Sequence, residues 1–193
     1  MAKTHAADST RDALLRAAEH LVRSRGYSAF SYADLSEAVG VRKASIHHHF
    51  PSKADLGCAL VDEYIARFER ACADIESTHD SAVKRLELYG DVYAQSLRGG
   101  HLCLCGMLAT ELSVLPDGVP ERVRAFFSAQ IAWLQQAIAM GQTRGELSRR
   151  RSAKQSAEFV LGTLQGAMLL GWVGKDHRGV ERAVDELLIS LKS

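Results

Sequence analysis

The sequence predicts an all-α protein of about nine helices. Proline, the strongest breaker of helix interiors, occurs only three times among 193 residues. Alanine, leucine, glutamate and arginine are frequent while runs of β-branched residues are scarce, which favours helices over strands. Apolar residues recur three and four positions apart along most of the chain, as on one face of a helix. With 47% hydrophobic and 24% charged residues, the composition is that of a folded protein and excludes a disordered chain.

Three short helices are expected before Pro51. A serine that can act as an N-terminal cap opens each of the first two, and a glycine ends each of them. At Gly26 a left-handed C-terminal cap is expected. Two short helices joined by a tight turn are typical of a helix-turn-helix, although an ordinary helical hairpin has the same spacing. The expected ranges are about 9–26, 31–40 and 43–50.

Six more helices are expected after Ser52. The first of them repeats apolar residues every four positions, and glycines or prolines separate most of the others. Their ranges are about 53–77, 81–97, 102–115, 119–143, 152–173 and 180–191. The chain is therefore expected to divide into a small N-terminal domain, residues 1–52, and a larger C-terminal domain, residues 53–193.

Composition and charge narrow the possible partners. The longest apolar run, residues 167–173, is far shorter than the ~20 residues that span a bilayer, so no membrane partner is expected. The N-terminus is polar and has no apolar signal core, which predicts a cytoplasmic protein. In that compartment Cys58, Cys72, Cys103 and Cys105 are expected to be free thiols. A net charge of +1 does not by itself indicate a nucleic-acid partner.

The first quarter of the chain carries a specific pattern of residues. Its parts are Arg11, Ala17-Ala18, Gly26-Tyr27, the block ADLSEAVGV at 33–41, and above all the block ASIHHHFPSKADL at 44–56. Together these residues resemble the TetR family of bacterial transcriptional repressors. The resemblance implies an N-terminal three-helix DNA-binding domain of helix-turn-helix type, followed by a helical ligand-binding and dimerisation domain. Beyond the first quarter, only the length and the helix pattern agree with the family.

The resemblance places the third short helix in the major groove of DNA, where side chains reach base edges and phosphates. Arg42 and Lys43 lie at the start of this helix, where the positive end of the helix dipole also favours phosphate. Ile46 and Phe50 are apolar and four residues apart, so they are assigned to the core. Lys53 resembles the family's phosphate-contacting lysine. The expected DNA-binding residues are Ser31, Tyr32, Arg42, Lys43, Ser45, His47, His48 and Lys53.

The three adjacent histidines depart from the family, which commonly has tyrosine in place of His47. A protonated histidine adds charge near phosphate, and an unperturbed histidine titrates near ~6.5. DNA affinity is therefore expected to rise as the pH falls from about 7.5 to about 6. Neighbours on a helix point about 100° apart, so His47, His48 and His49 do not converge on one metal ion. A structural role is expected for His49.

A second group of chemically reactive side chains comprises His101, Cys103 and Cys105. On a helix the two cysteines face opposite sides, whereas in an extended segment all three residues share a side as soft metal ligands. Plain packing, a reactive thiol and a metal site therefore remain open. Some family members sense electrophiles or oxidants through a cysteine near the start of their sixth helix, a position that Cys103 resembles. The hypothesis is that such compounds modify Cys103 and release DNA.

The same three residues support an alternative function, a cytosolic thiol- or metal-dependent helical enzyme. Against it, the chain has no glycine-rich phosphate loop, no serine-nucleophile motif and no paired zinc-ligand clusters. Neither catalysis nor a cofactor is therefore expected.

The resemblance places the ligand site among the fourth to eighth helices. Small-molecule sites are mostly apolar with a few polar anchors, and core packing is the alternative for each apolar residue. Tyr89 and Leu108 belong to the same apolar set. The expected ligand-binding residues are Tyr64, Phe68, Tyr93, His101, Cys103, Met107, Phe126, Gln130, Trp133, Gln165 and Met168.

The last two helices carry a surplus of apolar surface, which predicts a two-fold dimer interface. Gly162 and Gly166 share one face and permit close approach of another helix. Burial within one subunit is the alternative, while in the family this helix pair from each subunit forms a four-helix bundle. The expected interface residues are Leu161, Gly162, Gly166, Leu169, Trp172, Val184, Leu187, Leu188 and Leu191.

The expected function is thus a ligand-responsive repressor that binds a near-palindromic operator as a homodimer. A two-fold dimer places two recognition helices in successive major grooves, about 34–36 Å apart. A small-molecule or thiol-reactive inducer is expected to favour a state with a different separation. The long helix at 53–77 is the expected lever between the two domains.

Overall fold

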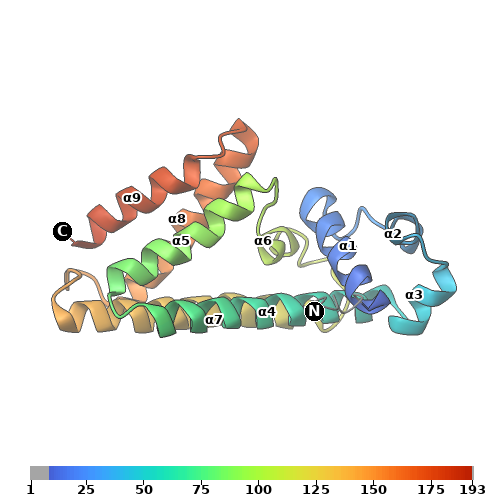
Figure 1. Ribbon diagram of the computed structural model, residues 1–193, viewed down its shortest axis with the longest axis horizontal. Coiled ribbons are helices and arrows are strands. Elements are labelled where there is room, and N and C mark those ends of the chain that lie inside the picture. Colours follow the sequence, from blue (N-terminus) through green and yellow to red (C-terminus); the bar gives the residue numbers. More distant parts are fainter. Residues whose placement is uncertain (1–8, 193) are drawn as a thin grey trace, which may run out of the picture.

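The structure, a computed structural model, describes residues 9–192, and this part of the chain contains nine helices and no strand. The predicted all-α fold is confirmed. Three short helices form one end of an elongated molecule, and six helices form the rest (Figure 1). The first eight residues of the expected N-terminal domain, and Ser193, lie outside the described residues.

The first two N-terminal helices begin and end where the capping residues indicate, and the third has no side-chain cap. The three helices are α1 (Thr10–Arg25), α2 (Tyr32–Val39) and α3 (Lys43–His49). The Ser31 side chain and the Asp34 carboxylate form a complete capping box, and Gly40 ends α2 in the left-handed conformation. Ile46 and Phe50 are buried, as expected for core residues. The tight turn between α2 and α3 completes the predicted helix-turn-helix.

Gly26 differs from the expected left-handed cap. Its φ of 91° is positive, but its ψ of 162° lies outside the left-handed helical region. The chain here turns toward Glu111, whose carboxylate accepts hydrogen bonds from the backbone N–H of Tyr27 (2.6 Å) and of Ser28 (2.9 Å). A Cβ at Gly26 would lie 2.6 Å from the Glu111 Oε1 atom. Glycine is therefore favoured by the backbone angle, and a side chain at this position would displace the Glu111 carboxylate.

Six helices make up the C-terminal part, and the two longest, α4 and α7, run alongside each other (Figure 1). The short α6 differs from the expected helix at 102–115. Cys103 caps its start, and turns replace the helix beyond Ala109, where Glu111 reaches back to the loop after α1. The helices are α4 (Lys53–Thr78), α5 (Ala82–Arg98), α6 (Leu104–Ala109), α7 (Val119–Arg144), α8 (Ala153–Gly174) and α9 (Gly179–Lys192).

By length and composition, α8 is the one helix of the described residues that could cross a membrane, which the short apolar run at 167–173 did not indicate. Core helices of soluble proteins meet the same criteria. One side of α8 packs against α7 and α9, and 33% of its most apolar stretch is buried inside this single chain.

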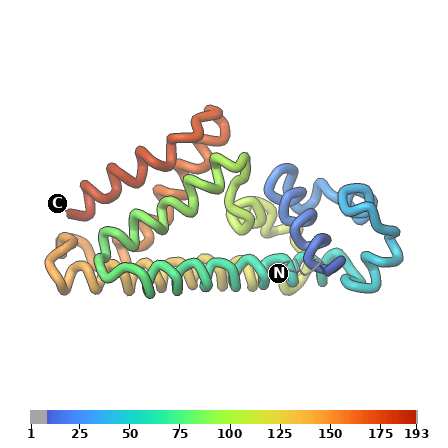
Figure 2. Tube along the Cα trace, viewed as in Figure 1, coloured from blue at the N-terminus to red at the C-terminus, as the bar shows by residue number. Residues whose placement is uncertain are grey.

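The two parts of the molecule are joined by more than the chain connection between α3 and α4. The Cα trace places α1 beside α6, and packing contacts also join α1 to α4 (Figure 2). Polar contacts reinforce this junction, because Glu111 holds the loop after α1 and Arg23 of α1 reaches residues at the end of α5 and before α6. The helix α1 therefore rests directly on the C-terminal part of the chain.

Candidate DNA-binding surface and ligand cavity

The surface of α3 carries five of the predicted DNA-binding residues. Ile46 points into the core, which leaves the opposite side of this short helix facing solvent. Two cations lie at its start, and no acidic residue lies in its first turn. The exposed or half-buried residues of this surface are Arg42, Lys43, Ser45, His47 and His48. His49 is half-buried, and its ring lies 6.5 Å from that of Phe50, consistent with the structural role expected of it.

The imidazole of His47 has a defined orientation. Its Nδ1 atom lies 3.1 Å from the carbonyl oxygen of Pro51, and a carbonyl only accepts, so Nδ1 carries the proton. The ring also packs edge-on against Tyr32, with centroids 4.9 Å apart. In the neutral ring Nε2 is then only an acceptor. A hydrogen bond from Nε2 to a phosphate oxygen therefore requires the protonated ring.

Two other predicted DNA-binding side chains make contacts inside the domain. The Tyr32 hydroxyl donates to the carbonyl oxygens of Phe50 (2.9 Å) and Ser52 (2.6 Å). Burial, followed by the nearby Asp55 carboxylate, raises the pKa of Tyr32 to about 12, so the hydroxyl remains a donor. Ser31 is exposed, but its hydroxyl caps the N-terminus of α2.

Lys53, which the family resemblance assigns to a phosphate contact, makes hydrogen bonds inside the protein in this structure. Its ammonium group donates to the carbonyl oxygens of Tyr27 (2.7 Å) and Phe30 (2.5 Å). It also lies over both aromatic rings, 4.6 and 4.4 Å from their centroids. Burial lowers the pKa of Lys53, although Glu111 opposes that shift. In this structure the lysine turns inward and ties the loop after α1 to the start of α4.

A cavity of about 330 Å³ lies between α1, α4, α5, α7, α8 and the segment before α6. Seven predicted ligand-binding residues line it, as does Tyr89. The seven are Tyr64, Phe68, Tyr93, Cys103, Phe126, Gln130 and Met168. The lining also contains residues absent from the prediction, namely Glu19, Arg23, Arg67, Ala71, Cys72, Ile75, Val92 and Ser96.

The remaining four predicted ligand-binding residues lie outside this lining. The Trp133 ring stacks on Tyr89 with centroids 5.3 Å apart, and the Gln165 amide donates to the Tyr93 hydroxyl (3.3 Å). Met107 is half-buried and packs against the core. His101 faces away toward α1, where its Nε2 lies 3.1 Å from His20 Nδ1. Trp133 and Gln165 therefore contact the cavity-lining residues Tyr89 and Tyr93 without lining the cavity themselves.

A polar group lies deep in the otherwise mainly apolar cavity. The Gln130 side chain is only 1% exposed, and its Oε1 accepts hydrogen bonds from the hydroxyls of Tyr89 and Tyr93. Burial raises the pKa of both phenols, so both remain protonated donors. Among the described residues, the Nε2 of Gln130 has no hydrogen-bond partner.

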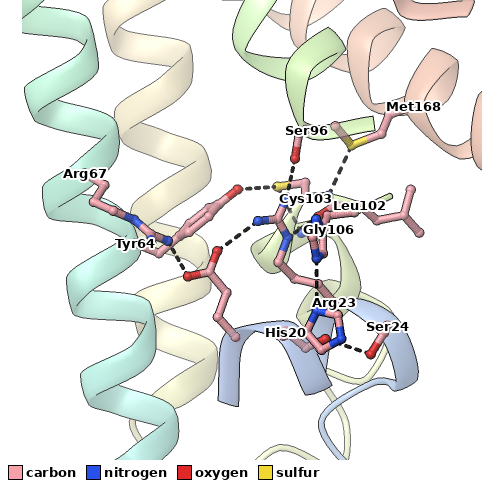
Figure 3. A network of polar contacts seen from close by, with 12 residues as sticks. His20, Arg23, Ser24, Tyr64, Arg67, Ser96, Leu102, Cys103, Gly106 and Met168 are labelled. Carbon is pink, nitrogen blue, oxygen red and sulfur yellow. Dashed lines mark hydrogen bonds and ion pairs between the residues drawn. The ribbon is translucent and has the colours of Figure 1, made fainter. Parts of the chain in front are cut away.

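One wall of the cavity is charged and reaches into the N-terminal domain (Figure 3). Glu19 pairs with Arg23 at 2.9 Å, one turn along α1, and with Arg67 of α4 at 2.5 Å. Arg23 also donates to the Leu102 carbonyl (2.6 Å) and to the Ser96 hydroxyl. Glu19, Arg23 and Arg67 could not be predicted as a group from the sequence, because no local signal marks a contact across about 80 residues.

Cys103 lies where the cavity meets α6, and Figure 3 shows its thiol facing Tyr64. Its Sγ accepts from the backbone N–H of Gly106 (3.4 Å) and lies 3.8 Å from the Tyr64 hydroxyl. Its own N–H donates to the Met168 sulfur (3.1 Å). The side chain is 4% exposed and acts as the N-terminal cap of α6.

Cys105 and His101 do not join Cys103 in a common site. Cys105 is fully buried in the core, and this burial raises the pKa of its thiol far above the ordinary range. His101 pairs with His20. The described residues contain no group of three or more His, Cys, Asp or Glu side chains suited to a metal ion. The predicted alternative, an enzyme built on these three residues, thus lacks a shared site.

The expected dimer residues fall into two sets. Leu161, Val184, Leu187 and Leu191 are buried within the single chain, so they belong to its core and the expectation for these four is corrected. Val184, for example, packs closely on Gly90 of α5. A Cβ atom added at Gly90 would lie 2.3 Å from the Val184 Cγ2 atom. Leu188 is half-buried. The exposed set on α8 is Gly162, Gly166, Leu169 and Trp172, joined by Phe159, Leu170 and Val173.

Comparisons with known proteins agree with this architecture. The family model for bacterial regulatory proteins of the tetR family matches residues 14–59, and the model for the tetracyclin repressor-like C-terminal domain matches residues 82–187. The HTH-type transcriptional repressor DhaR of Mycobacterium sp. (strain GP1) is 31% identical over 146 residues, which cover 75% of this chain and 73% of that protein.

Two solved structures extend the similarity to the whole described fold. A TetR-family transcriptional regulator from Agrobacterium tumefaciens is 35% identical with a TM-score of 0.91, covering 95% of this chain and 97% of that one. The reduced form of Escherichia coli NemR is 26% identical with a TM-score of 0.80, covering 93% and 95%. The chain therefore belongs to the TetR family of bacterial transcriptional regulators.

Proposed function

We propose that this protein is a cytoplasmic transcriptional repressor that binds a near-palindromic operator as a homodimer and leaves it when a small molecule occupies the cavity. The main supporting observation is that the DNA-binding domain itself contributes Glu19 and Arg23 to the cavity wall. A molecule that enters the cavity therefore contacts α1 directly. The relatives named above include a transcriptional repressor and a TetR-family transcriptional regulator.

The exposed surface of α3 supplies the sequence-reading contacts in this proposal. A helix of this size fits the major groove, and Arg42 and Lys43 reach phosphates from its start. Ser45, His47 and His48 follow on the same exposed surface. In this proposal the exposed Ser31, at the start of α2, faces the phosphate backbone of the DNA next to the groove that α3 occupies. Lys53 contributes indirectly by fixing the start of α4 to the loop after α1.

Dimerisation uses the exposed apolar face of α8 and Ile189 of α9. Leu170 and Val173 are each 75% exposed, and a Cβ at Gly162 or Gly166 would meet no atom within 4 Å. Exposed apolar surface of this extent is typical of a protein-protein interface, and a two-fold axis pairs it with its own copy. The dimer then presents two copies of α3 about 34–36 Å apart.

This interface is tested by introducing a charge. Leu170→Glu is expected to convert the dimer to a monomer, whereas Val114→Glu, which alters another highly exposed apolar residue outside α8, is expected to leave a dimer. Multi-angle light scattering measures the mass. A dimer that persists in Leu170→Glu, or dissociates in both variants, contradicts the proposed face.

Ligand control follows from the way α1 is held. Arg23 joins α1 to Leu102 and Ser96 of the C-terminal domain, and its partner Glu19 joins α1 to Arg67 of α4. A ligand that binds more tightly when these contacts are rearranged shifts the equilibrium toward that arrangement. The N-terminal domain then moves relative to its copy, and the spacing of the two α3 helices no longer matches the operator.

A thiol-reactive inducer is a second candidate, favoured by the position of the Cys103 sulfur in the cavity wall. In the proposed step the thiolate adds to the β-carbon of an α,β-unsaturated carbonyl compound, so a C–S bond forms. The π electrons move toward the carbonyl, and the α-carbon takes up the proton that the thiol lost. The thioether is bulkier than the thiol that caps Gly106, so the start of α6 shifts.

Cys72 is a matched control for this step because it lines the same cavity, while burial raises its pKa to about 12. Acrolein is expected to release DNA from the wild type and from Cys72→Ser but not from Cys103→Ser. Release that survives in Cys103→Ser contradicts the covalent route.

DNA binding itself is tested with the duplex that lies upstream of the protein's own coding sequence. Fluorescence anisotropy at several salt concentrations is expected to give tight binding whose logarithm falls linearly with the logarithm of the salt concentration. Binding of similar strength to a scrambled duplex, or no binding at all, contradicts the proposed function.

A further inference from the structure

We infer that the ligand of the cavity is a small organic anion with an apolar body, whose anionic head binds Arg23 and Arg67 and whose far end accepts a hydrogen bond from Gln130. This inference rests on the proposed function only in calling the ligand an inducer. The chemistry that selects it comes from two separate parts of the cavity wall.

The charged wall of the cavity has a net charge of +1. Among the residues that line the cavity, Glu19, Arg23 and Arg67 are the charged ones, so two guanidinium groups share one carboxylate. The side chains of Glu19 and Arg23 are only 12% and 13% exposed, so water screens this pair weakly. A carboxylate is the group that best matches a guanidinium in charge and geometry. The wall thus favours an anionic head over a neutral or cationic one.

The deep end supplies a donor without a partner. Gln130 is 1% exposed, its oxygen already accepts from two tyrosine hydroxyls, and its Nε2 has no hydrogen-bond partner among the described residues. A buried amide donor without a partner is unfavourable, so a ligand that supplies an acceptor there gains affinity. A carbonyl or ether oxygen is such an acceptor.

The rest of the cavity wall is mainly apolar, and the cavity is small. Phe68, Phe126 and Ile75 are among its apolar lining residues, and the volume of about 330 Å³ is near the lower end of the usual range for ligand sites, about 300–1,000 Å³. A single ring or a short chain fits such a space better than a large polycyclic molecule. The ligand class is therefore a small monocarboxylate that carries a second oxygen at its far end.

The position of the head also explains how binding reaches α1. A carboxylate on Arg23 and Arg67 competes with Glu19 for the same guanidinium groups. When Glu19 loses these partners, α1 loses its ion pair to α4. By thermodynamic linkage, a ligand that weakens operator binding must itself bind more weakly to the operator-bound protein.

The test uses a matched set of single-ring probes with the intact protein. The set comprises 4-acetylbenzoate, its neutral methyl ester, and 4-isopropylbenzoate, which keeps the head and replaces the distal carbonyl with an apolar group. Isothermal titration calorimetry at pH 7.5 measures each affinity. We expect 4-acetylbenzoate to bind at least tenfold more tightly than the ester and several-fold more tightly than 4-isopropylbenzoate. An ester that binds as tightly as the acid, or no binding of either acid, overturns the inference.

Variants of Arg67 and Gln130 test which residue causes the preference for an acid and which causes the preference for a distal carbonyl group. Arg67→Gln is expected to lower the affinity for both acids about tenfold and to leave the ester unchanged, while Arg70→Gln serves as control because Arg70 pairs with Glu63 away from the cavity. Arg67 is 41% exposed, so its replacement does not bury an unpaired group. Gln130→Leu is expected to remove only the preference for 4-acetylbenzoate over 4-isopropylbenzoate. A preference for acid over ester that persists in Arg67→Gln contradicts the assignment of the head.

Operator binding of the ligand-free protein is measured separately by anisotropy. If the probes bind as expected but the protein binds no operator, the proposed function fails while the ligand class stands. If the operator binds but the ester equals the acid, the ligand class fails alone.

Discussion

The cations at the start of α3 and the cations at the junction between the two parts of the molecule are the same residue types in opposite surroundings. Arg42 and Lys43 face solvent at the start of a helix. Arg23 and Lys53, in contrast, are half-buried and donate to backbone carbonyl oxygens. An exposed cation is available to a polyanion such as DNA, whereas an internally bonded cation fixes the two parts of the molecule together.

The largest effect is expected from removing the exposed cations. The double variant Arg42→Ala/Lys43→Ala is expected to lower operator affinity about 10- to 100-fold, because each lost phosphate contact removes a charge-assisted hydrogen bond. The salt dependence of binding is expected to weaken by about one unit of slope per lost contact. Anisotropy titrations measure both quantities. Arg150→Ala, an exposed cation in the loop between α7 and α8, is the control and is expected to change neither.

Lys53→Met tests the other side of the comparison. It removes the donor to two carbonyl oxygens, so the free energy of unfolding is expected to fall by about 1–3 kcal/mol. Urea denaturation followed by circular dichroism measures this change. If the variant has unchanged stability but strongly reduced DNA affinity, the result would support the phosphate-contacting role that the family resemblance implies for Lys53.

The pH dependence of DNA binding tests whether His47 of α3 contacts phosphate. Because the Nδ1–H of His47 is held by the Pro51 carbonyl, only the protonated ring donates from Nε2 to phosphate. Operator affinity of the wild type is expected to be higher at lower pH, and His47→Tyr is expected to lack most of this pH dependence. Equal pH slopes in the two proteins would remove His47 from the phosphate contacts.

A smaller pH effect is expected at the junction between α1 and the segment before α6. Burial, then the positive Arg23, then His20 lower the pKa of His101, so the folded protein resists protonation that the unfolded chain accepts. The stabilising effect of neutral His101 is therefore complete above its ordinary pKa of ~6.5 and is lost as the pH falls through its lowered value.

The thermal midpoint of the wild type is accordingly expected to fall more steeply between pH 7 and pH 5 than that of His101→Gln. His177→Gln, which alters an exposed histidine between α8 and α9, is expected to behave like the wild type. Parallel curves for His101→Gln and the wild type would show that this histidine pair does not sense pH.

Features that depend on interactions between residues close in the sequence could be predicted, whereas features that depend on distant residues could not. Caps and glycines act over three or four residues, so the sequence predicts the bounds of most helices and the core positions of Ile46 and Phe50. The inward turn of Lys53 depends on carbonyl groups more than 20 residues away. The shortness of α6 likewise depends on Glu111 reaching the loop after α1.

The cavity shows the same limit. Its aromatic residues on α4, α5 and α7 recur at helical spacing and could be predicted as a set. Glu19 and Arg23 could not, because their spacing on α1 indicates only a local ion pair. Their function arises when α1 packs on α4 and α6, a contact that no local pattern in one sequence specifies.

The central claim is that ligand binding in the cavity and DNA binding by α3 are coupled through α1. The most direct measurement is the operator affinity of the wild type and of Arg67→Gln with and without saturating 4-acetylbenzoate. We expect the ligand to weaken operator binding at least tenfold in the wild type and to have little effect at the same concentration in Arg67→Gln, each compared with the same protein without ligand. Operator affinity that does not change when the ligand fills the cavity of the wild type would contradict the account.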